Sequence, residues 1–156
     1  MIQIKARMSD VYATIHTVIV KDPEIRRLMG FDEGLSEEDE FLQRATKVLK
    51  RKMSTELLEG QTMPLITFYK LPGGREHDNF LSYLTPFDFD IYTNNDVELA
   101  IDIADRINEL FDDKYLPLAK GSSLRNSYTT SGEDKTELKD VYKYYTQIIF
   151  NLSLEG

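Results

Sequence analysis

The chain has 156 residues, no cysteine and a formal net charge of -8, from 27 acidic and 19 basic residues. This length suits one domain with its own core, over residues 1–156, and the lack of cysteine excludes disulfides, thiolate metal sites and cysteine nucleophiles. Because an acidic chain repels phosphate, we do not expect tight binding of nucleic acid.

The first predicted elements are two helices. Apolar residues at helical spacing follow Ser9, which we predict to be the N-cap of the first helix. Asp22 and Pro23 suit the start of a second, short helix, and Gly30 suits its end. Polar residues interrupt the first apolar run, so we expect neither a signal peptide nor a membrane span, which needs about 20 apolar residues.

A third helix is predicted from Ser36 to about Met53. Ser36 with an acidic residue three positions later resembles a weakened capping box. Acidic residues gather in the first turn and basic residues in the last, which complements the helix dipole. We therefore interpret the basic run at residues 50–52 as a helix end and not as a nucleic-acid patch. The acidic group is Glu37, Glu38, Asp39 and Glu40, and the basic group is Lys47, Lys50, Arg51 and Lys52.

Strands are predicted in the middle of the chain. Residues 64–71 have the composition of a strand and run into a Pro-Gly-Gly turn. Residues 75–86 suit either a loop or a hairpin arm. Apolar and polar residues then alternate over residues 87–92, which predicts a strand with one face on the core. Asp88 and Asp90 fall on the opposite face, which we expect to be solvated.

The remainder of the chain predicts one helix and a hairpin. Asn95, with Glu98 three residues later, suits the capping box of a helix over residues 96–112. Residues 123–132 favour a strand, residues 130–139 a polar loop, and residues 140–154 a long strand in which every second residue is aromatic or apolar. Helices, strands, one helix and a closing hairpin together indicate an α+β fold, with helices on a mixed, mostly antiparallel sheet.

Asp88 and Asp90 are the residues that raise the possibility of an enzyme. Two carboxylates on one strand face can share a divalent cation, with Asp78 or Asp102 as a further ligand. The same two residues are also expected without any metal, because the outward positions of a half-buried strand are usually polar. No phosphate-binding loop or paired histidine motif accompanies them. We therefore expect no catalysis, no cofactor and no metal site, and retain a metal-dependent enzyme as the alternative.

The closing hairpin is the candidate interface. Its tyrosines and the basic residues Arg125, Lys139 and Lys143 allow stacking on nucleic acid, but the net charge favours a protein interface. The polar loop at residues 130–139 is expected to order when it docks on a partner. The candidate contact residues are Thr130, Ser131, Gly132, Glu133, Asp134, Lys135, Tyr142 and Tyr144.

Four segments in this order carry a resemblance to a known family. They are "VKDPEIRRLMG", "MPLITFYKL", "FDFDIYTNNDVELAIDIADRINELF" and "VYKYYTQIIFNLSL". Together they resemble the tail terminator, or tail-to-head joining, proteins of long-tailed bacteriophages. The resemblance covers most of the chain in outline. Residues 32–40 and the helix after them are additional to the simplest family pattern.

The resemblance implies a structural virion protein of the tail and neck, present in the host cytoplasm during assembly. It implies a homohexameric ring at the head-proximal end of the tail tube, which stops tube growth and joins the tail to the head connector or head-completion protein. DNA would pass through the ring without specific binding. A head-completion or other neck protein is the nearest alternative, and a host adaptor with an exposed sheet edge is a third.

Overall fold

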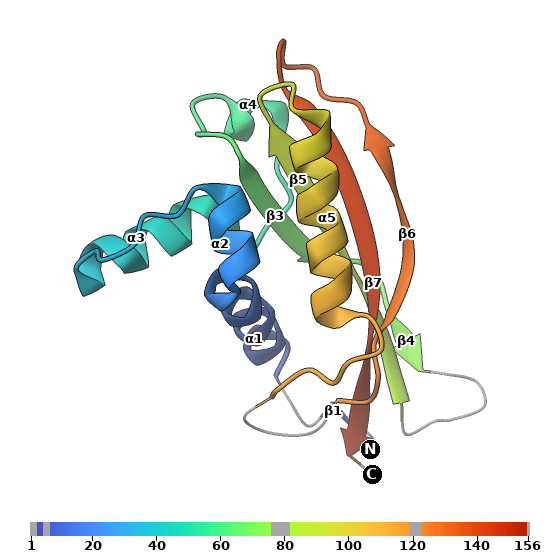
Figure 1. Cartoon of the computed structure of the whole chain (residues 1–156). Coiled ribbons are helices and arrows are strands. Elements are labelled where there is room, and N and C mark those ends of the chain that lie inside the picture. Colours follow the sequence, from blue (N-terminus) through green and yellow to red (C-terminus); the bar gives the residue numbers. More distant parts are fainter. Residues whose placement is uncertain (1–2, 5–6, 76–81, 119–122, 156) are drawn as a thin grey trace.

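The computed structural model describes residues 3–4, 7–75, 82–118 and 123–155 of the chain. Helices pack on a mixed sheet, so the predicted α+β class is confirmed (Figure 1). Within the described residues, no helix is both long and apolar enough to cross a membrane. The elements are β1 (Gln3–Ile4), α1 (Met8–Lys21), α2 (Pro23–Met29), α3 (Glu37–Lys47), β2 (Val48–Leu49), α4 (Thr55–Leu58), β3 (Leu65–Lys70), β4 (Gly74–Arg75), β5 (Ser82–Thr93), α5 (Val97–Phe111), β6 (Ser127–Asp134) and β7 (Tyr142–Glu155).

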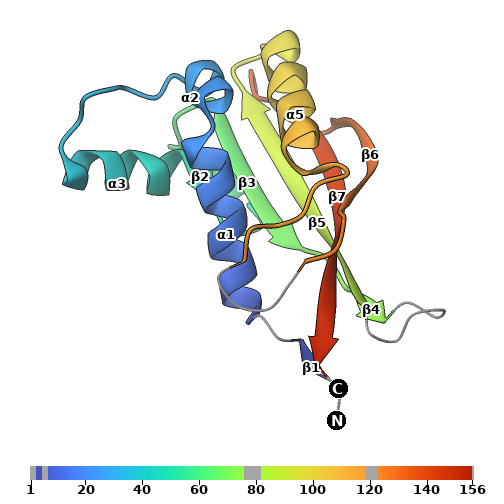
Figure 2. The ribbon, with the colours of Figure 1, turned by 60° about the horizontal axis from the view of Figure 1, so that its bottom comes forward.

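The sheet is built around β5 and β7. Its strand order is β1-β7-β5-β3-β2, while β4 also pairs with β5 and β6 with β7. All pairs are antiparallel except β2 with β3. β5 and β7 pair along their length, from Ser82 opposite Ser153 to Thr93 opposite Tyr142. The end of β7 then pairs with β1, so the two chain ends lie side by side (Figures 1 and 2).

The main core lies between this sheet and the helices α1, α2 and α5 (Figure 2). As the alternation predicts, Phe87, Phe89 and Ile91 of β5 face the helices and are fully buried. Phe89 stacks on Phe111 of α5 with ring centroids 5.7 Å apart, and Phe150 of β7 packs edge-on against Phe111 at 5.3 Å. The aromatic contacts fix α5 across the two central strands.

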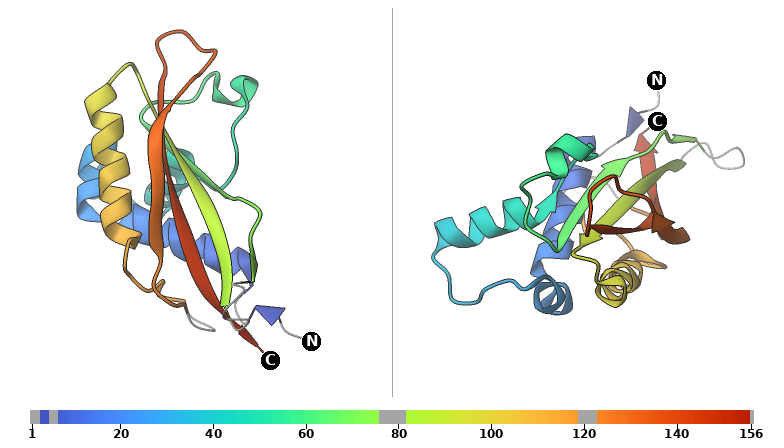
Figure 3. Two further views of the ribbon diagram at one scale, coloured as in Figure 1. Left: turned by 90° about the vertical axis from the view of Figure 1, so that its right-hand side faces the viewer. Right: turned by 90° about the horizontal axis from the view of Figure 1, so that it is seen from above.

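A second, smaller hydrophobic cluster covers part of the opposite sheet face. Leu65 and Tyr92 point to this face, where Met53 and Leu58 pack on them. The segment that contains α4 and the tip of the β6–β7 hairpin therefore fold over one end of the sheet (Figure 3). This face was expected to be solvated, and its partial cover changes the environment of Asp88 and Asp90.

The starts of the first two helices differ in how well they were predicted. Ser9 is not the N-cap of α1, because the helix begins one residue earlier and Arg7 occupies the cap position without a side-chain hydrogen bond. The cap of α2 is as predicted: Asp22 accepts a 3.0 Å hydrogen bond from the backbone N–H of Ile25. Gly30 ends that helix with a φ of 70°, in the left-handed region that glycine adopts without strain.

Helix α3 is shorter than predicted, since it ends at Lys47 and not near Met53. Val48 leaves the helix to pair in parallel with Ile66 of β3, and its side chain becomes buried. The long-range pairing outweighs the helix-forming residues that follow. The basic run at residues 50–52 is therefore not the end of a helix, and the prediction that it complements the dipole of α3 is wrong.

The caps of the later helices show one correct and one shifted prediction. Ser36 caps α3, as predicted. The cap of α5 is Asp96, which accepts a hydrogen bond from the backbone N–H of Leu99, and not Asn95. Asn95 instead takes a left-handed conformation, with a φ of 57°, in the tight turn after β5. Glu98 therefore does not complete a capping box.

One loop prediction is partly wrong, and the structure decides between two alternatives for another segment. β5 begins at Ser82 and pairs antiparallel with β4, so residues 82–86 form the hairpin arm that the sequence offered beside a loop. β6 continues to Asp134, so the first half of the predicted loop at residues 130–139 is strand. Pairing with β7 extends this polar segment, which has little intrinsic strand preference.

Candidate functional site

The predicted contact residues lie on β6 and the adjoining end of β7. Within the described part of the chain β6 pairs only with β7 (Figure 1). The backbone N–H of Tyr128 donates to Asp112 at 2.8 Å, so the other edge of β6 is open beyond Tyr128. Thr130, Glu133, Asp134 and Lys135 are exposed, while Ser131 and Gly132 are half-buried. Open backbone groups on an edge strand are a template for pairing with another chain. The structure thus places six of the eight candidates along a free sheet edge or just beyond it.

The other two candidates face the helices. Tyr142 and Tyr144 are half-buried and pack against the main core. The hydroxyl of Tyr144 donates to Oγ of Ser131 at 3.4 Å, and Ser131 also lies 2.7 Å from the hydroxyl of Tyr128. Burial and the carboxylate of Glu133 raise the pKa of Tyr142 to about 12. These tyrosines therefore support β6 from the core side and do not themselves form an open contact face.

Gly132 lets a tyrosine ring cross the edge strand. It pairs with Tyr145 of β7, and a Cβ at position 132 would lie 3.3 Å from the Tyr145 hydroxyl and 3.5 Å from its ring. An added Cβ would touch the ring and would require the Tyr145 hydroxyl to shift by a few tenths of an ångström. The ring of Tyr145 and the backbone of β6 therefore pack closely on the sheet face that the helices do not cover.

A chain of charges joins three neighbouring strands on that face. Nζ of Lys143 on β7 lies 2.9 Å from a carboxylate oxygen of Asp134 on β6. The same Nζ lies 3.6 Å from Asp90 on β5. Beside it, the amide of Gln147 donates to Asp88 at 3.1 Å. The arrangement holds β6 to the centre of the sheet through side chains as well as through backbone pairing.

Asp88 and Asp90 are on the predicted face, but the expectation that they are solvated is wrong. Asp90 is only 1% exposed and Asp88 only 5%. Burial of Asp90, with the Asp88 carboxyl next to it, raises the pKa of Asp90 to about 8, against the pull of Lys143. One carboxyl oxygen of Asp90 is buried without a hydrogen-bond partner among the described residues, an environment that favours an uncharged carboxyl.

The two aspartates also shift the pKa values of the neighbouring tyrosine and lysine side chains. Burial raises the pKa of Tyr92 to about 12, and Asp90 adds to the shift. Tyr69 is affected in the same direction, because burial and both aspartates raise its pKa. Burial alone would lower the pKa of Lys143, but Asp134 and Asp90 outweigh it and raise that pKa above its ordinary value. The side chains thus form one coupled polar cluster under the sheet surface.

The contacts of this polar cluster hold β5, β6 and β7 together. Asp102 lies on α5, which packs on the opposite sheet face, so it does not join Asp88 and Asp90. Asp78 lies outside the described residues. In the described part of the chain no group of three or more histidine, aspartate or glutamate side chains could hold a metal ion. The two carboxyls face Lys143 and Gln147, which connect them to β7.

Sequence reasoning missed Lys143 and Gln147 as side-chain partners of the aspartates, and Tyr145 as the residue opposite Asp90 in the sheet. All three fall on the polar positions of the alternating segment over residues 140–154, and that alternation was the available signal. The alternation does not give the register between β5 and β7. In the structure Asp88 pairs with Gln147, and Asp90 pairs with Tyr145. Only the pairing of β5 with β7 brings these groups together.

The comparisons with known proteins identify a fold and no family. No protein-family model matches the chain, and no curated protein sequence matches it. Among solved structures, a chain of the virion of the native gene transfer agent (GTA) particle is similar, with a TM-score of 0.64 and 11% sequence identity. The match covers 95% of this chain and 98% of that one. At this identity the similarity concerns the fold, over nearly the whole length of both chains.

Proposed function

We propose that this protein is a non-enzymatic structural subunit of a phage-like virion, and specifically a tail terminator. The observation that carries the proposal is the shared fold with a chain of a gene transfer agent virion, which leaves almost no part of either chain unmatched. The four sequence segments that resemble tail terminators supply the more specific place, at the head-proximal end of the tail tube. The polar cluster around Asp90 then has a mechanical role, since it stiffens the sheet.

The proposed mechanism is the closure of a homohexameric ring. A closed ring of identical subunits needs a heterologous contact, in which one surface of each copy meets a different surface of the next. Such a ring offers one face to the last layer of tail tube protein and the other to the head connector or head-completion protein. The open edge of β6 and the adjoining loop are the candidate contact with the tube or with the connector.

The charge of the chain is compatible with passage of DNA through the ring. With a net charge of -8, six copies present a strongly acidic assembly. Acidic walls repel phosphate, so DNA slides through such a lumen without being held. No specific nucleic-acid contact is part of the proposal.

A head-completion or other neck protein is the nearest alternative, because the same fold evidence applies to it. The two differ in what they act on. A terminator binds the tube end and limits tube length, whereas a head-completion protein binds the connector and leaves the tube alone.

The test is the growth of tubes from the tail tube protein of the same virion, with and without this chain. Electron microscopy should show shorter tubes with a ring at one end when the protein is present. A variant with β6 blocked, such as Thr130→Arg, should leave tubes long, and the exposed α1 change Ala13→Arg should not. Tubes of equal length and without end rings would contradict the terminator proposal.

A further inference from the structure

Strand β6 has an open backbone edge over residues 130–134. A bulge between Tyr128 and Thr130 interrupts its register with β7, and the register is regular from Thr130 to Asp134. Among the described residues, the backbone of this regular stretch makes no hydrogen bond on the side away from β7. In an antiparallel pair, alternate residues direct both N–H and C=O away from the neighbouring strand. The outer side of β6 therefore presents free donors and acceptors to solvent (Figures 1 and 3).

The other edges of the sheet do not offer such a stretch. Strands β1, β2 and β4 have two residues each, and very short edge strands give little room for pairing with another chain. β3 extends beyond β2, but there the N–H of Lys70 donates to the hydroxyl of Tyr12 on α1 at 2.7 Å. Among the described strands, β6 is therefore the edge that has several open backbone groups in succession.

This asymmetry limits what a second copy of the chain can contribute at the edge. The β6 strand of one copy could pair only with β6 of another, because the remaining edges are short or closed. Two identical strands that pair with each other are related by a two-fold axis, and such a contact gives a dimer and cannot by itself close a ring. A ring of copies therefore leaves the β6 edge for a different protein.

Gly132 leaves room for another strand in the middle of the open stretch. It carries no side chain, and a Cβ there would lie 3.5 Å from the ring of Tyr145 on β7 and 3.3 Å from its hydroxyl. That hydroxyl has no hydrogen-bond partner among the described residues. A glycine within a strand often marks a place where another backbone approaches closely. A strand added at this edge can thus reach the ring and the hydroxyl of Tyr145.

The carboxylate next to this glycine favours a basic partner. Glu133 is exposed and lies beside the hydroxyl of Tyr142, and no cation pairs with it among the described residues. Asp134 differs, because Lys143 already pairs with it at 2.9 Å. Opposite charges across an interface select the right partner, and like charges oppose the wrong one. A strand with a lysine or arginine beside Glu133 is therefore favoured.

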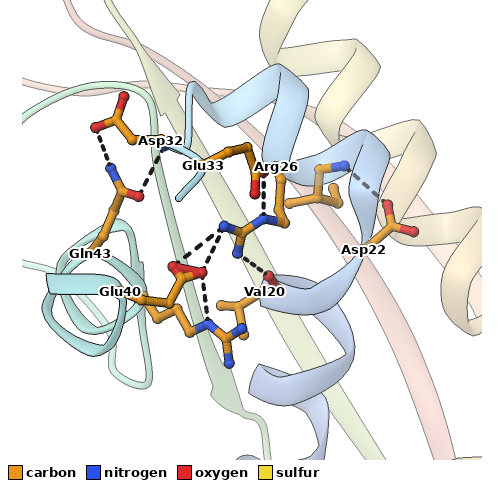
Figure 4. A network of polar contacts seen from close by, with 9 residues as sticks. Val20, Asp22, Arg26, Asp32, Glu33, Glu40 and Gln43 are labelled. Carbon is orange, nitrogen blue, oxygen red and sulfur yellow. Dashed lines mark hydrogen bonds and ion pairs between the residues drawn. The ribbon is translucent and has the colours of Figure 1, made fainter. Parts of the chain in front are cut away.

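Carboxylates near α3, on the opposite side of the molecule, are paired within the chain. Arg26 of α2 pairs with Glu40 at 2.6 Å and with Glu33 at 3.2 Å, and donates to the carbonyl oxygen of Val20 at 2.9 Å (Figure 4). This polar network positions α3 on its own chain. Glu133 has no such arginine, so its charge remains free to meet a partner.

We propose that residues 130–134 pair through their open backbone with an extended segment of a neighbouring virion protein, which places a lysine or arginine beside Glu133. The inference rests on the proposed function, because the tail tube or the head connector supplies that neighbour. It deepens the proposed function by naming the mode of contact and the charge of the partner. Main-chain hydrogen bonds give such a contact its affinity, and the flanking side chains give it specificity.

Hydrogen exchange tests the backbone pairing directly, because an added strand protects amides that were open to water. The chain is measured alone, and bound to tail tubes or to head connectors of the same virion. Peptides from residues 129–134 should exchange about tenfold more slowly in one of these complexes. Peptides from β5, which is paired on both sides, should exchange alike in all samples. Unchanged exchange of β6 in a complex that forms would overturn the inference and leave the proposed function standing.

The remaining outcomes separate the inference from the proposed function. Slower exchange of β6 on connectors alone would support the inference and count against a terminator. Slower exchange in the chain alone, growing with its concentration, would mean that β6 pairs with β6 and would overturn the inference. Binding to neither tubes nor connectors would contradict both.

Glu133→Lys tests the charge of the partner segment. It should weaken binding about tenfold, because it places a cation beside the lysine or arginine of the partner, and the circular dichroism spectrum should not change. Glu137→Lys, exposed in the loop after β6, is the matched control and should bind like the wild type. Equal binding of Glu133→Lys and the wild type would overturn the basic partner segment.

Discussion

Lys143 on β7 and Asp90 on β5 lie side by side beneath the sheet surface, with Nζ 3.6 Å from the carboxylate oxygen. The same lysine reaches Asp134 on the edge strand β6 at 2.9 Å. The ammonium group of Lys143 on β7 thus lies between a carboxyl on β5 and a carboxyl on β6. These contacts hold the open edge of the sheet to its centre. These ion pairs explain why the polar strand β6 can stay ordered at a sheet edge that is expected to bind another protein.

Asp90 should make the stability of the chain depend on pH. Its pKa is raised to about 8 in the folded protein, so the folded chain binds this proton more tightly than the unfolded chain does. The contribution of Asp90 to the free energy of unfolding is therefore complete below its ordinary pKa and is lost as pH rises to about 8. The free energy of unfolding should fall over this window, with a slope of at most about 1.4 kcal/mol per pH unit for one proton. Asp90→Asn should flatten the profile in denaturant unfolding. An equally flat profile for the wild type would contradict the raised pKa, and Asp105→Asn, exposed on α5, is the control.

At about pH 9, where Asp90 is ionised, Lys143→Met should destabilise the fold by about 2 kcal/mol, because it leaves a buried carboxylate without its partner. The loss should shrink when Asp90→Asn is already present, since the pair then has less charge to compensate. Denaturant midpoints of the two single variants and the double variant give the coupling energy. Additive losses would mean that the two side chains do not interact. Lys139→Met, exposed in the loop before β7, should change little.

Arg26→Met should loosen α3 without unfolding the rest. It removes the ion pair with Glu40 and the hydrogen bond to the carbonyl oxygen of Val20, and the expected loss of stability is about 2 kcal/mol. Limited proteolysis should cut within residues 32–47 faster than in the wild type. Arg27→Met, a more exposed arginine on the same helix, is the matched control. Equal cleavage rates in both variants would show that the polar network does not position α3.

Thr130→Arg should block assembly while leaving the subunit folded. Thr130 is exposed on β6, so a long charged side chain there is tolerated in the free chain but obstructs a partner at the edge. Sedimentation with tail tubes should detect the loss of binding, and circular dichroism should be unchanged. Binding equal to that of the wild type and of Ala13→Arg would remove the β6 edge from the interface.

The fold follows from the sequence mainly where local pattern and tertiary contact agree. The alternation of β5 puts Phe87 and Phe89 on the core, and the broad apolar stripe of α5 packs on them. The exceptions depend on partners far away in the chain. Helix α3 ends early because Val48 pairs with Ile66, and no local signal contains that contact.

The candidate site was predicted only in part, for the same physical reason. Asp88 and Asp90 have the spacing of an outward strand face, and the face is as predicted, but cover from residues 49–63 and from β7 is set by tertiary packing. The exposure of Phe41 and Leu42, the apolar side of α3, was not predicted either. Helical spacing of apolar residues shows that a helix is amphipathic and does not show which side meets the molecule.

The homohexameric ring can be tested by light scattering behind a sizing column, with and without magnesium, followed by negative-stain imaging. We predict a species of six times the 18.1 kDa chain mass, seen as six-fold rings with a central channel. Magnesium should not be required, because carboxyls held by Lys143 and Gln147 need no cation. A monomer that forms no ring under any condition, including in the presence of tail tubes, would contradict the proposed terminator ring.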